Sequence, residues 1–371
     1  MKIGVVKEIK NNEYRVGLAP AGTHTLTENG HEVYIEKSAG AGSGFEDSDY
    51  TDVGGKILNT ADEIYNTADI IVKVKEPMEQ EYNLLKEGQT IYTFLHLAAD
   101  KPLAQKLMEK KITGLAYETV TDAEGKFPLL MPMSEVSGRL STQIGANLLL
   151  RHNGGSGVLL GGVSGVLPGE VLVIGGGVVG ANAAKMAIGL GARVTIMDIN
   201  VNRLRELADS FGTCIQTQAY SPLAAAELVK TCDLLISGVY VAGAKAPKVV
   251  TSDMVKGMKK GSVIIDVAID QGGSIETANR VSSHDNPTYE EFGVIHYAVA
   301  NMPGSVPFTS TKALTNTTLP LLLDIANKGV INAIKENPHL KNGINTFSGF
   351  ITHKAVAESL ELEFTCLDGL I

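Results

Sequence analysis

The sequence predicts an α/β protein of two domains, each built on a doubly wound parallel sheet, with a cleft between the domains. Three observations favour this fold class. Short apolar runs alternate with helical stretches, which is the pattern of parallel strands joined by crossover helices. A glycine triplet at 175–180 directly follows one of the apolar runs. The 371 residues are enough for two domains, each with its own core.

Residues 1–128 are expected to form the sheet of the first domain. Its strands are predicted at five short apolar runs: Ile3–Val6, Glu32–Glu36, Asp69–Val74, Thr90–Leu95 and Gly114–Glu118. Helices are predicted between some of these strands, at about Pro20–Asn29 and Lys101–Lys111. This alternation favours a parallel sheet covered by helices on both faces. The region has no G-x-G-x-x-G spacing, so we expect its sheet to bind something other than a dinucleotide.

A long helix is predicted at Ser134–His152, because Leu140, Ile144 and Leu148 recur at helical spacing. We expect this helix to lead into a second domain, residues 129–306. Beyond the glycine triplet, the strands of that domain are predicted at Leu234–Ile236, Val263–Ile269 and Val294–Val299.

The pattern of the second domain ends at Pro303, Gly304 and Pro307. A helix from about Phe308 to Asn327 follows, and we expect residues 307–371 to pack on the first domain. The second domain is then inserted into a discontinuous first domain of residues 1–128 and 307–371. The predicted cleft between two such domains is a common kind of site for a small ligand.

The segment 171–198 predicts a dinucleotide-binding, Rossmann-like turn. The run Val171–Ile174 has the length and β-branched content of a buried strand. Gly175, Gly177 and Gly180 follow it in G-x-G-x-x-G spacing. A helix of small residues, a second strand and Asp198 then come in the expected order. A glycine triplet alone could be a simple turn, but the whole series is specific to nucleotide binding.

Each glycine of the triplet has a physical role. Gly175 permits the tight turn out of the strand, Gly177 lets a pyrophosphate approach the backbone, and Gly180 lets the helix pack close to the strand. The first turn of that helix, with Val178 and Val179, directs unpaired N–H groups and a partial positive charge at the phosphates.

Asp198 is expected to set the choice of cofactor. It follows Gly180 by 18 residues, close to the spacing at which an acid accepts hydrogen bonds from the adenosine ribose. Its carboxylate would repel a 2′-phosphate, so NAD is predicted rather than NADP. Arg203 lies close enough in sequence to soften that preference.

Composition excludes several other classes of protein. The net charge of −9 argues against a nucleic-acid surface. The three cysteines are odd in number and lack metal-ligand spacing, so we expect no metal site and a reducing, cytoplasmic location. The N-terminal apolar run is too short for a signal peptide. Charged residues interrupt the apolar stretch around the glycine motif, so we expect no membrane span.

Four charged or titratable residues stand near the ends of predicted strands: Arg15, Lys75, His96 and Asp270. In open α/β sheets, ligands bind beyond the carboxyl ends of the strands. Each residue alone could be a solvated cation, a turn former or a satisfied structural histidine. Together with a nicotinamide cofactor, they would supply a carboxylate clamp, a group that polarises a carbonyl and groups for proton transfer.

Eight segments resemble the alanine dehydrogenase family: Asn12–Val16, Val74–Pro77, Phe94–Ala99, Pro132–Val136, Gly175–Gly180, Ala244–Pro247, Asp270–Gly273 and Ala300–Pro303. The similarity runs from Met1 to about residue 350. Most of these segments are not general Rossmann features, so the resemblance is specific. It implies reversible, NAD-dependent oxidative deamination of L-alanine to pyruvate and ammonium, in a homo-oligomer that in this family is a hexamer.

The resemblance also implies roles for individual residues. Arg15 and Lys75 would hold the substrate carboxylate and carbonyl, Met133 would face its small side chain, and His96 and Asp270 would transfer protons. Which of the last two holds the proton at each step stays open. Cofactor contacts are implied for Ser134, Val239, Tyr240, Val267, Ala268, Ile269, Asp270, Val299, Ala300, Asn301 and Met302. The sequence departs from the family at 218–221, so the position of a further contact near Ser221 is left open.

Three other functions compete with this interpretation. The NAD-binding subunit of a proton-translocating transhydrogenase shares the two-domain plan but needs a membrane partner, and it gives Lys75 and His96 no substrate. A saccharopine-type dehydrogenase would need more room beyond Met133. A non-catalytic NAD-sensing module would bind NADH without any alanine-dependent absorbance change.

Overall fold

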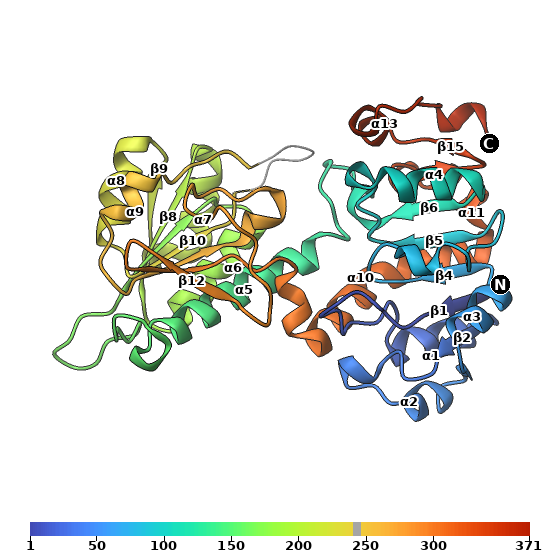
Figure 1. Cartoon of the computed structure of the whole chain (residues 1–371), viewed down its shortest axis with the longest axis horizontal. Coiled ribbons are helices and arrows are strands. Elements are labelled where there is room, and N and C mark those ends of the chain that lie inside the picture. The colour runs from blue at the N-terminus through green and yellow to red at the C-terminus, as the bar shows by residue number, and fades with distance from the viewer. Residues whose placement is uncertain (240–245) are drawn as a thin grey trace. The chain divides into compact units, whose positions relative to one another are not determined.

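The computed structural model describes residues 1–239 and 246–371 and divides into two compact units (Figure 1). Unit 1 comprises Met1–Met133 and Val306–Ile371, and unit 2 comprises Ser134–Ser305. Each unit contains one mostly parallel sheet with helices packed on it. The predicted α/β class with two parallel sheets is therefore confirmed.

The sheet of unit 1 has eight strands in the order β15-β14-β6-β5-β4-β1-β2-β3. The strands are β1 (Lys2–Val5), β2 (Glu32–Glu36), β3 (Lys56–Leu58), β4 (Ile70–Val72), β5 (Thr90–Thr93), β6 (Thr113–Ala116), β14 (Ile344–Phe347) and β15 (Phe350–Ile351). Strands β1 to β6 are parallel, and the β14–β15 hairpin adds to β6 in the antiparallel sense. The carboxyl ends of β1, β4, β5 and β6 therefore share one edge.

Helices cover both faces of this sheet, which buries β4 and β5 completely. One face packs against α3, α4 and α13, and α10 covers the other, where Tyr92 of β5 donates a hydrogen bond to the Thr318 carbonyl at 3.1 Å. The helices are α1 (Pro20–Glu28), α2 (Asp47–Thr51), α3 (Ala61–Thr67), α4 (Lys101–Glu109), α10 (Pro307–Lys328), α11 (Val330–Glu336), α12 (Pro338–Lys341) and α13 (Lys354–Leu360). Burial on both faces explains why these strands are continuous apolar runs.

The sheet of unit 2 has seven strands in the order β12-β13-β11-β10-β7-β8-β9, all parallel except β12. The strands are β7 (Glu170–Ile174), β8 (Arg193–Asp198), β9 (Ile215–Ala219), β10 (Leu234–Ser237), β11 (Val263–Asp266), β12 (Thr288–Glu291) and β13 (Val294–Tyr297). The helices are α5 (Met131–Leu148), which begins in unit 1, α6 (Val178–Gly189), α7 (Val201–Phe211), α8 (Pro222–Thr231) and α9 (Ser252–Lys256).

Several predicted boundaries were wrong at the carboxyl ends of strands. The strand predicted at Val263–Ile269 ends at Asp266 and continues as a 3₁₀ turn, Val267–Gln271. The cause is the Asp266 carboxylate, which accepts the N–H of Ala268 at 3.0 Å and caps that turn. The strand predicted at Gly114–Glu118 likewise ends at Ala116, before a 3₁₀ turn at Tyr117–Thr119. Apolar runs locate these strands but do not show where capping ends them.

Candidate active site

The residues predicted to bind substrate lie beyond the carboxyl edge of the unit 1 sheet. Lys75 comes three residues after β4, and His96 comes three residues after β5. Arg15 lies in the loop that follows β1. Because β4 and β5 are parallel neighbours and β1 pairs with β4, the three loops leave the sheet on the same side.

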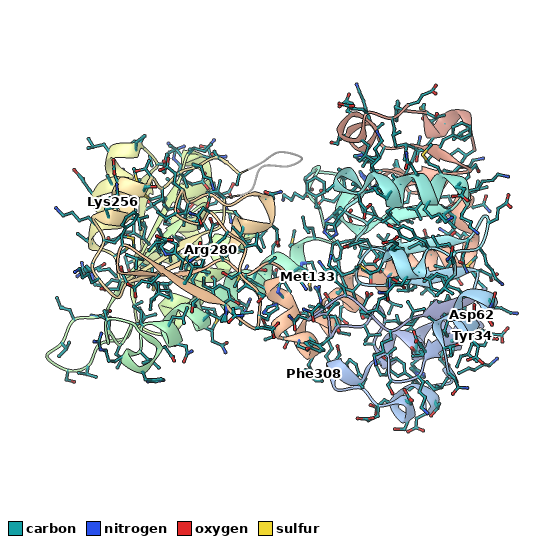
Figure 2. The ribbon with its side chains drawn as sticks, viewed as in Figure 1. Tyr34, Asp62, Met133, Lys256, Arg280 and Phe308 are labelled. Atoms are coloured by element: carbon teal, nitrogen blue, oxygen red, sulfur yellow. The ribbon has the colours of Figure 1, made fainter. Side chains whose placement is uncertain are left out.

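Arg15 is held as a buried cation. Only 2% of it is exposed, and its Nε and Nη2 donate to the two carboxylate oxygens of Glu13 at 2.7 and 2.5 Å. Its Nη1 lies 3.1 Å from the sulfur of Met133, which is labelled in Figure 2. A fork-to-fork pair of this kind fixes the plane of the guanidinium. The structure therefore brings together Arg15 and Met133, the two residues predicted to face the carboxylate and side chain of a small amino acid.

Lys75 is partly buried near Arg15. Burial lowers the pKa of Lys75 below its ordinary value, and the nearby positive charge of Arg15 lowers it further. Its backbone is fixed on both sides, because the Thr93 hydroxyl donates to the Lys75 carbonyl at 2.9 Å and the Glu8 carboxylate accepts the Lys75 N–H at 3.2 Å. A poorly solvated cation responds strongly to an anionic ligand.

His96 is exposed, and its orientation depends on Glu76. The Nδ1 atom of His96 lies 3.2 Å from the Glu76 carboxylate, which also pairs with Lys10. Burial alone would raise the pKa of Glu76, but the hydrogen bonds from His96 and Lys10 outweigh it and lower that pKa to about 2. An ionised Glu76 favours the proton on Nδ1, which leaves Nε2 as the nitrogen that can accept one.

Sequence reasoning missed the acids of this site, Glu8, Glu13, Glu76 and Glu118. Glu13 and Glu76 stand inside segments that were singled out for Arg15 and Lys75, so a search for acids beside predicted cations would have found them. Glu8 and Glu118 hydrogen-bond to backbone N–H groups far away in sequence, and no local signal marks such a contact.

In unit 2, the glycine turn has the geometry that the spacing predicts. Gly175 has a φ of +97°, which a residue with a side chain rarely adopts. A Cβ on Gly180 would lie 1.8 Å from the Gly175 carbonyl oxygen, so only glycine fits. A Cβ on Gly177, the N-cap of α6, would meet no atom within 4 Å. The turn is thus tight at Gly175, closely packed at Gly180 and open at Gly177, as pyrophosphate binding requires.

Asp198 and Arg203 both brace this turn. Asp198 Oδ2 accepts the N–H of Gly176 at 2.6 Å, and its Oδ1 accepts the N–H of Asn200 at 2.8 Å. Arg203 Nε donates to the Gly176 carbonyl at 2.7 Å, while its Nη1 pairs with Glu206. Asp198 is partly exposed at the end of β8, where the ribose is predicted to bind.

Two further predicted cofactor turns meet each other. Val267–Asp270 lies in the 3₁₀ turn after β11, and Val299–Met302 follows β13. The N–H of Asn301, which has a φ of +58°, donates to the Asp270 carboxylate at 3.4 Å.

The other predicted contacts are more scattered. Ser134 lies in the first turn of α5, and Val239 packs against the core of unit 2. Tyr240 lies outside the described residues. Ser221, which was left open, is the N-cap of α8, and its hydroxyl accepts the N–H of Ala224 at 3.2 Å. Within residues 1–239 and 246–371, no group of three or more His, Cys, Asp or Glu residues could hold a metal ion.

Comparison with known families covers nearly the whole chain. Residues 4–137 match the model of the alanine dehydrogenase/PNT N-terminal domain. Residues 141–354 match the model of the alanine dehydrogenase/PNT C-terminal domain. This chain belongs to the alanine dehydrogenase/PNT family. The resemblance that the sequence motifs indicate is confirmed.

Individual relatives match this chain over all or nearly all of their length. The chain is 56% identical to an alanine dehydrogenase of Methanococcus maripaludis, over 98% of each chain. It is 53% identical to an alanine dehydrogenase of Staphylococcus saprophyticus, over 100% of each chain. A solved structure of an L-alanine dehydrogenase has a TM-score of 0.95 and 48% identity, covering 97% of this chain and 99% of the other.

A transhydrogenase from Sinorhizobium meliloti also matches, with a TM-score of 0.82 and coverage of 96% of this chain and 100% of the other. Its sequence identity is only 23%, so this similarity is evidence for a shared fold alone. In the described part of the chain, no helix is both long enough and apolar enough to cross a membrane.

Proposed function

We propose that this chain is an NAD-dependent L-alanine dehydrogenase, which interconverts L-alanine with pyruvate and ammonium. The observation that carries the proposal is the group of Arg15, Lys75 and His96 at one sheet edge, in a chain 56% identical to an alanine dehydrogenase over nearly its whole length. By the same resemblance, we expect a cytoplasmic homohexamer.

The glycine turn of unit 2 supports NAD as the cofactor. The N–H groups of Val178 and Val179 would bind the pyrophosphate over Gly177, and Asp198 would accept hydrogen bonds from the ribose. To do so, Asp198 Oδ1 would exchange its contact with the Asn200 N–H for a contact with a ribose hydroxyl. When bound, NAD would supply the acceptor for the hydride that leaves the Cα of alanine.

Unit 1 would hold the substrate by its charge and its small side chain. Arg15 binds the carboxylate, and Glu13 keeps the guanidinium in the plane that this contact needs. Met133, in contact with Arg15, limits the space for the side chain and so favours alanine over larger amino acids. Lys75 stabilises the negative charge that develops on the carbonyl oxygen of pyruvate or on its hydrated precursor.

Proton transfer falls to His96 or Asp270. Loss of the Cα hydride from the neutral amine leaves an iminium ion, which a water molecule must attack at carbon. His96 Nε2 or the Asp270 carboxylate removes a proton from that water, which gives the carbinolamine, and then returns the proton to the nitrogen. As ammonia leaves, the same group accepts the hydroxyl proton and pyruvate forms. Glu76 supports His96 in this role, because its carboxylate stabilises the imidazolium that forms.

A single assay tests the proposal: the initial rate of NADH formation, followed by absorbance, for purified protein with NAD and L-alanine. Parallel reactions replace NAD by NADP, or L-alanine by larger amino acids. We expect alanine-dependent NADH formation that is reversed by pyruvate and ammonium. Binding of NADH without any alanine-dependent signal would leave the NAD-sensing module and the transhydrogenase subunit as the remaining functions. Activity confined to larger amino acids would favour the saccharopine-type enzyme.

A further inference from the structure

Two carboxylates at the active edge of unit 1 make the same unusual contact. Glu8 follows β1 and Glu118 follows β6, and each accepts backbone N–H groups from the segment that follows the neighbouring strand, β4 or β5. On the basis of the proposed function, we propose that Glu8 and Glu118 are positioning residues, which hold Lys75 and His96 respectively in their working geometry. We name these two contacts the carboxylate clasps.

The first clasp connects β6 to β5. Glu118 Oε1 accepts the N–H of His96 at 2.6 Å, and its Oε2 accepts the N–H of Leu95 at 3.2 Å. His96 has a φ of +47°, in the left-handed region that non-glycine residues seldom adopt. A residue held in that region at a functional site needs surrounding contacts to keep it there. Glu118 supplies such a contact directly to the N–H of the strained residue.

The second clasp connects β1 to β4. Glu8 Oε1 accepts the N–H of Val74 at 2.6 Å and the N–H of Lys75 at 3.2 Å. Its Oε2 lies 3.3 Å from the ammonium of Lys73, which is fully buried and also contacts Glu81 at 2.8 Å. Burial would lower the pKa of Lys73, but its two carboxylate partners outweigh that effect and raise it. This charged Lys73 keeps Glu8 in place beneath the Lys75 loop.

The sheet order explains why the two clasps are equivalent. Four neighbouring strands have the order β6-β5-β4-β1. The two middle strands of this group, β5 and β4, lead to His96 and Lys75, and the strands on either side of them lead to Glu118 and Glu8. Register places Ala116 beside Thr93, so Glu118 and Leu95 each lie two residues further on. Register also places Val5 beside Val72, so Glu8 and Lys75 each lie three residues further on. Equal offsets bring each acid level with the backbone that it clasps.

Neither acid is assigned to contact substrate, so each should affect the reaction only through the residue that it positions. For Glu118 that residue is His96, and for Glu8 it is Lys75. Glu118→Gln replaces one accepting oxygen by an NH₂ group that faces an N–H donor, so one hydrogen bond of the clasp is lost. We expect this variant to lower kcat about tenfold, because proton transfer depends on where the imidazole lies. Glu8→Gln cannot accept from the backbone and from Lys73 at once, and we expect it to raise KM for pyruvate about tenfold.

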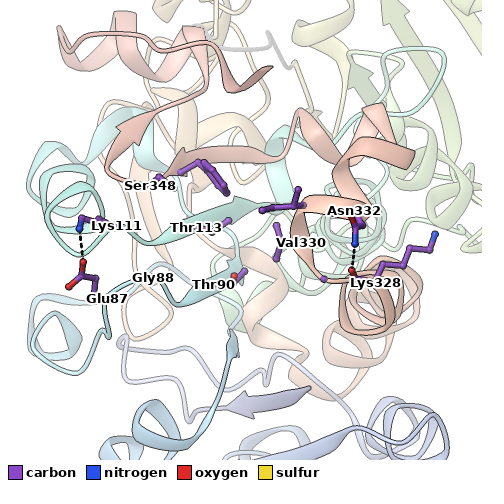
Figure 3. Close-up of a pocket in the computed structure, with 12 residues that line it drawn as sticks. Glu87, Gly88, Thr90, Lys111, Thr113, Lys328, Val330, Asn332 and Ser348 are labelled. Carbon is purple, nitrogen blue, oxygen red and sulfur yellow. Dashed lines mark hydrogen bonds and ion pairs between the residues drawn. The ribbon is translucent and has the colours of Figure 1, made fainter. Parts of the chain in front are cut away.

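A matched control comes from the opposite end of β5. Glu87 is exposed and pairs with Lys111 at 2.6 Å, beside a pocket of about 480 Å³ at the amino ends of β5 and β6 (Figure 3). Glu87→Gln makes the same chemical change in the same unit, and we expect wild-type kcat and KM. Thermal midpoint and NADH affinity are measured for every variant.

Crossed double variants separate positioning from general stability. In a His96→Ala background, Glu118→Gln should lower kcat no further, since the residue that it positions is gone. In the same background, Glu8→Gln should still raise KM for pyruvate about tenfold. Should Glu8→Gln lower the thermal midpoint strongly, Glu8→Asp takes its place, because it keeps the charge beside Lys73 but shortens the reach to the Lys75 N–H.

The outcomes are distinct. Wild-type kinetics in Glu118→Gln and in both Glu8 variants would overturn the proposal, as would a further fall in kcat when Glu118→Gln is added to His96→Ala. A kcat loss from Glu118→Gln only when His96 is present, with a KM effect from the Glu8 variant in both backgrounds, would support it. An unmodified chain inactive on alanine would instead overturn the proposed function.

Discussion

The sheet edge of unit 1 that carries Arg15, Lys75 and His96 and the glycine turn of unit 2 are candidate sites that would reach specificity by opposite means. In unit 2 the decisive features are backbone ones: a positive φ at Gly175, close packing at Gly180 and open space at Gly177. In unit 1 they are polar side chains, such as the Arg15 guanidinium and the His96 imidazole, each hydrogen-bonded to a carboxylate. A backbone site tolerates little added volume, whereas a charged site tolerates little change of partner. Substitutions in the two units should therefore impair different steps.

The largest expected effect is that of His96→Ala. Loss of the acid–base group should lower kcat about 100-fold or more, the usual size for this kind of catalysis. Because the change lies in unit 1, the NADH dissociation constant should not move. Steady-state rates with alanine and a fluorescence titration with NADH check both parts. Near wild-type turnover would remove His96 from the mechanism and leave Asp270 as the group for proton transfer.

A smaller effect is expected from Arg15→Lys, which keeps the positive charge but loses the planar fork. KM for pyruvate and alanine should rise roughly 30-fold, equivalent to about 2 kcal/mol of binding. The kcat value should change much less, and NADH affinity should stay at the wild-type value. Retention of charge avoids leaving Glu13 buried without a cation, which would also cost stability. An unchanged KM would refute the carboxylate clamp.

In unit 2, the corresponding substitution is Gly177→Ala. Its Cβ would meet no protein atom within 4 Å, so the thermal midpoint should not fall. The methyl group would occupy the approach of the pyrophosphate, and NADH should bind roughly tenfold more weakly, about 1.4 kcal/mol. Gly189→Ala is the control, because it adds a methyl group in open space elsewhere in α6. Equal NADH affinity in the two variants would argue against phosphate binding at Gly177.

The last expected effect concerns acid stability and leaves substrate and cofactor binding aside. The pKa of Glu76 is about 2 when folded and about 4.3 when unfolded, so its contribution is fully present above pH 4.3 and is lost as pH falls towards 2. The full difference is equivalent to about 3 kcal/mol, at 1.36 kcal/mol for each unit of pKa. Lys10 and His96 are 40% and 49% exposed, so solvent screening should reduce this to about 1–2 kcal/mol.

Glu76→Gln should therefore be less stable than wild type at pH 6 and equally stable near pH 2. Urea unfolding followed by circular dichroism at both values gives the comparison. A constant difference at all pH values would show that the loss of stability is unrelated to the charge of Glu76.

The same contrast between the units explains what could be predicted from the sequence. The glycine turn is local, since strand, triplet and helix are contiguous, so spacing alone located it. The candidate cations could be found because they follow buried strands. Two of the carboxylates, Glu8 and Glu118, could not be found in this way. Glu118 contacts the backbone 22 and 23 residues away, and Glu8 contacts it 66 and 67 residues away. Such contacts depend on strand order and register, which composition does not reveal.

Secondary structure failed for a related reason. Strand β9 was missed because four of its five residues are exposed, so it shows no apolar run. The long strand predicted through Ile269 was wrong because the Asp266 side chain accepts the Ala268 N–H and starts a turn. Local hydrophobicity cannot distinguish a strand from a capped turn when both are buried.

The most direct measurement is the initial rate of NADH formation by the purified wild-type chain and by His96→Ala, each saturated with NAD and supplied with L-alanine. We predict alanine-dependent NADH formation by the wild-type chain and a rate that is lower by a factor of about 100 or more for His96→Ala. The NADH dissociation constant should be the same for both proteins. Tight NADH binding by a wild-type chain that forms no NADH from alanine would contradict the proposed function.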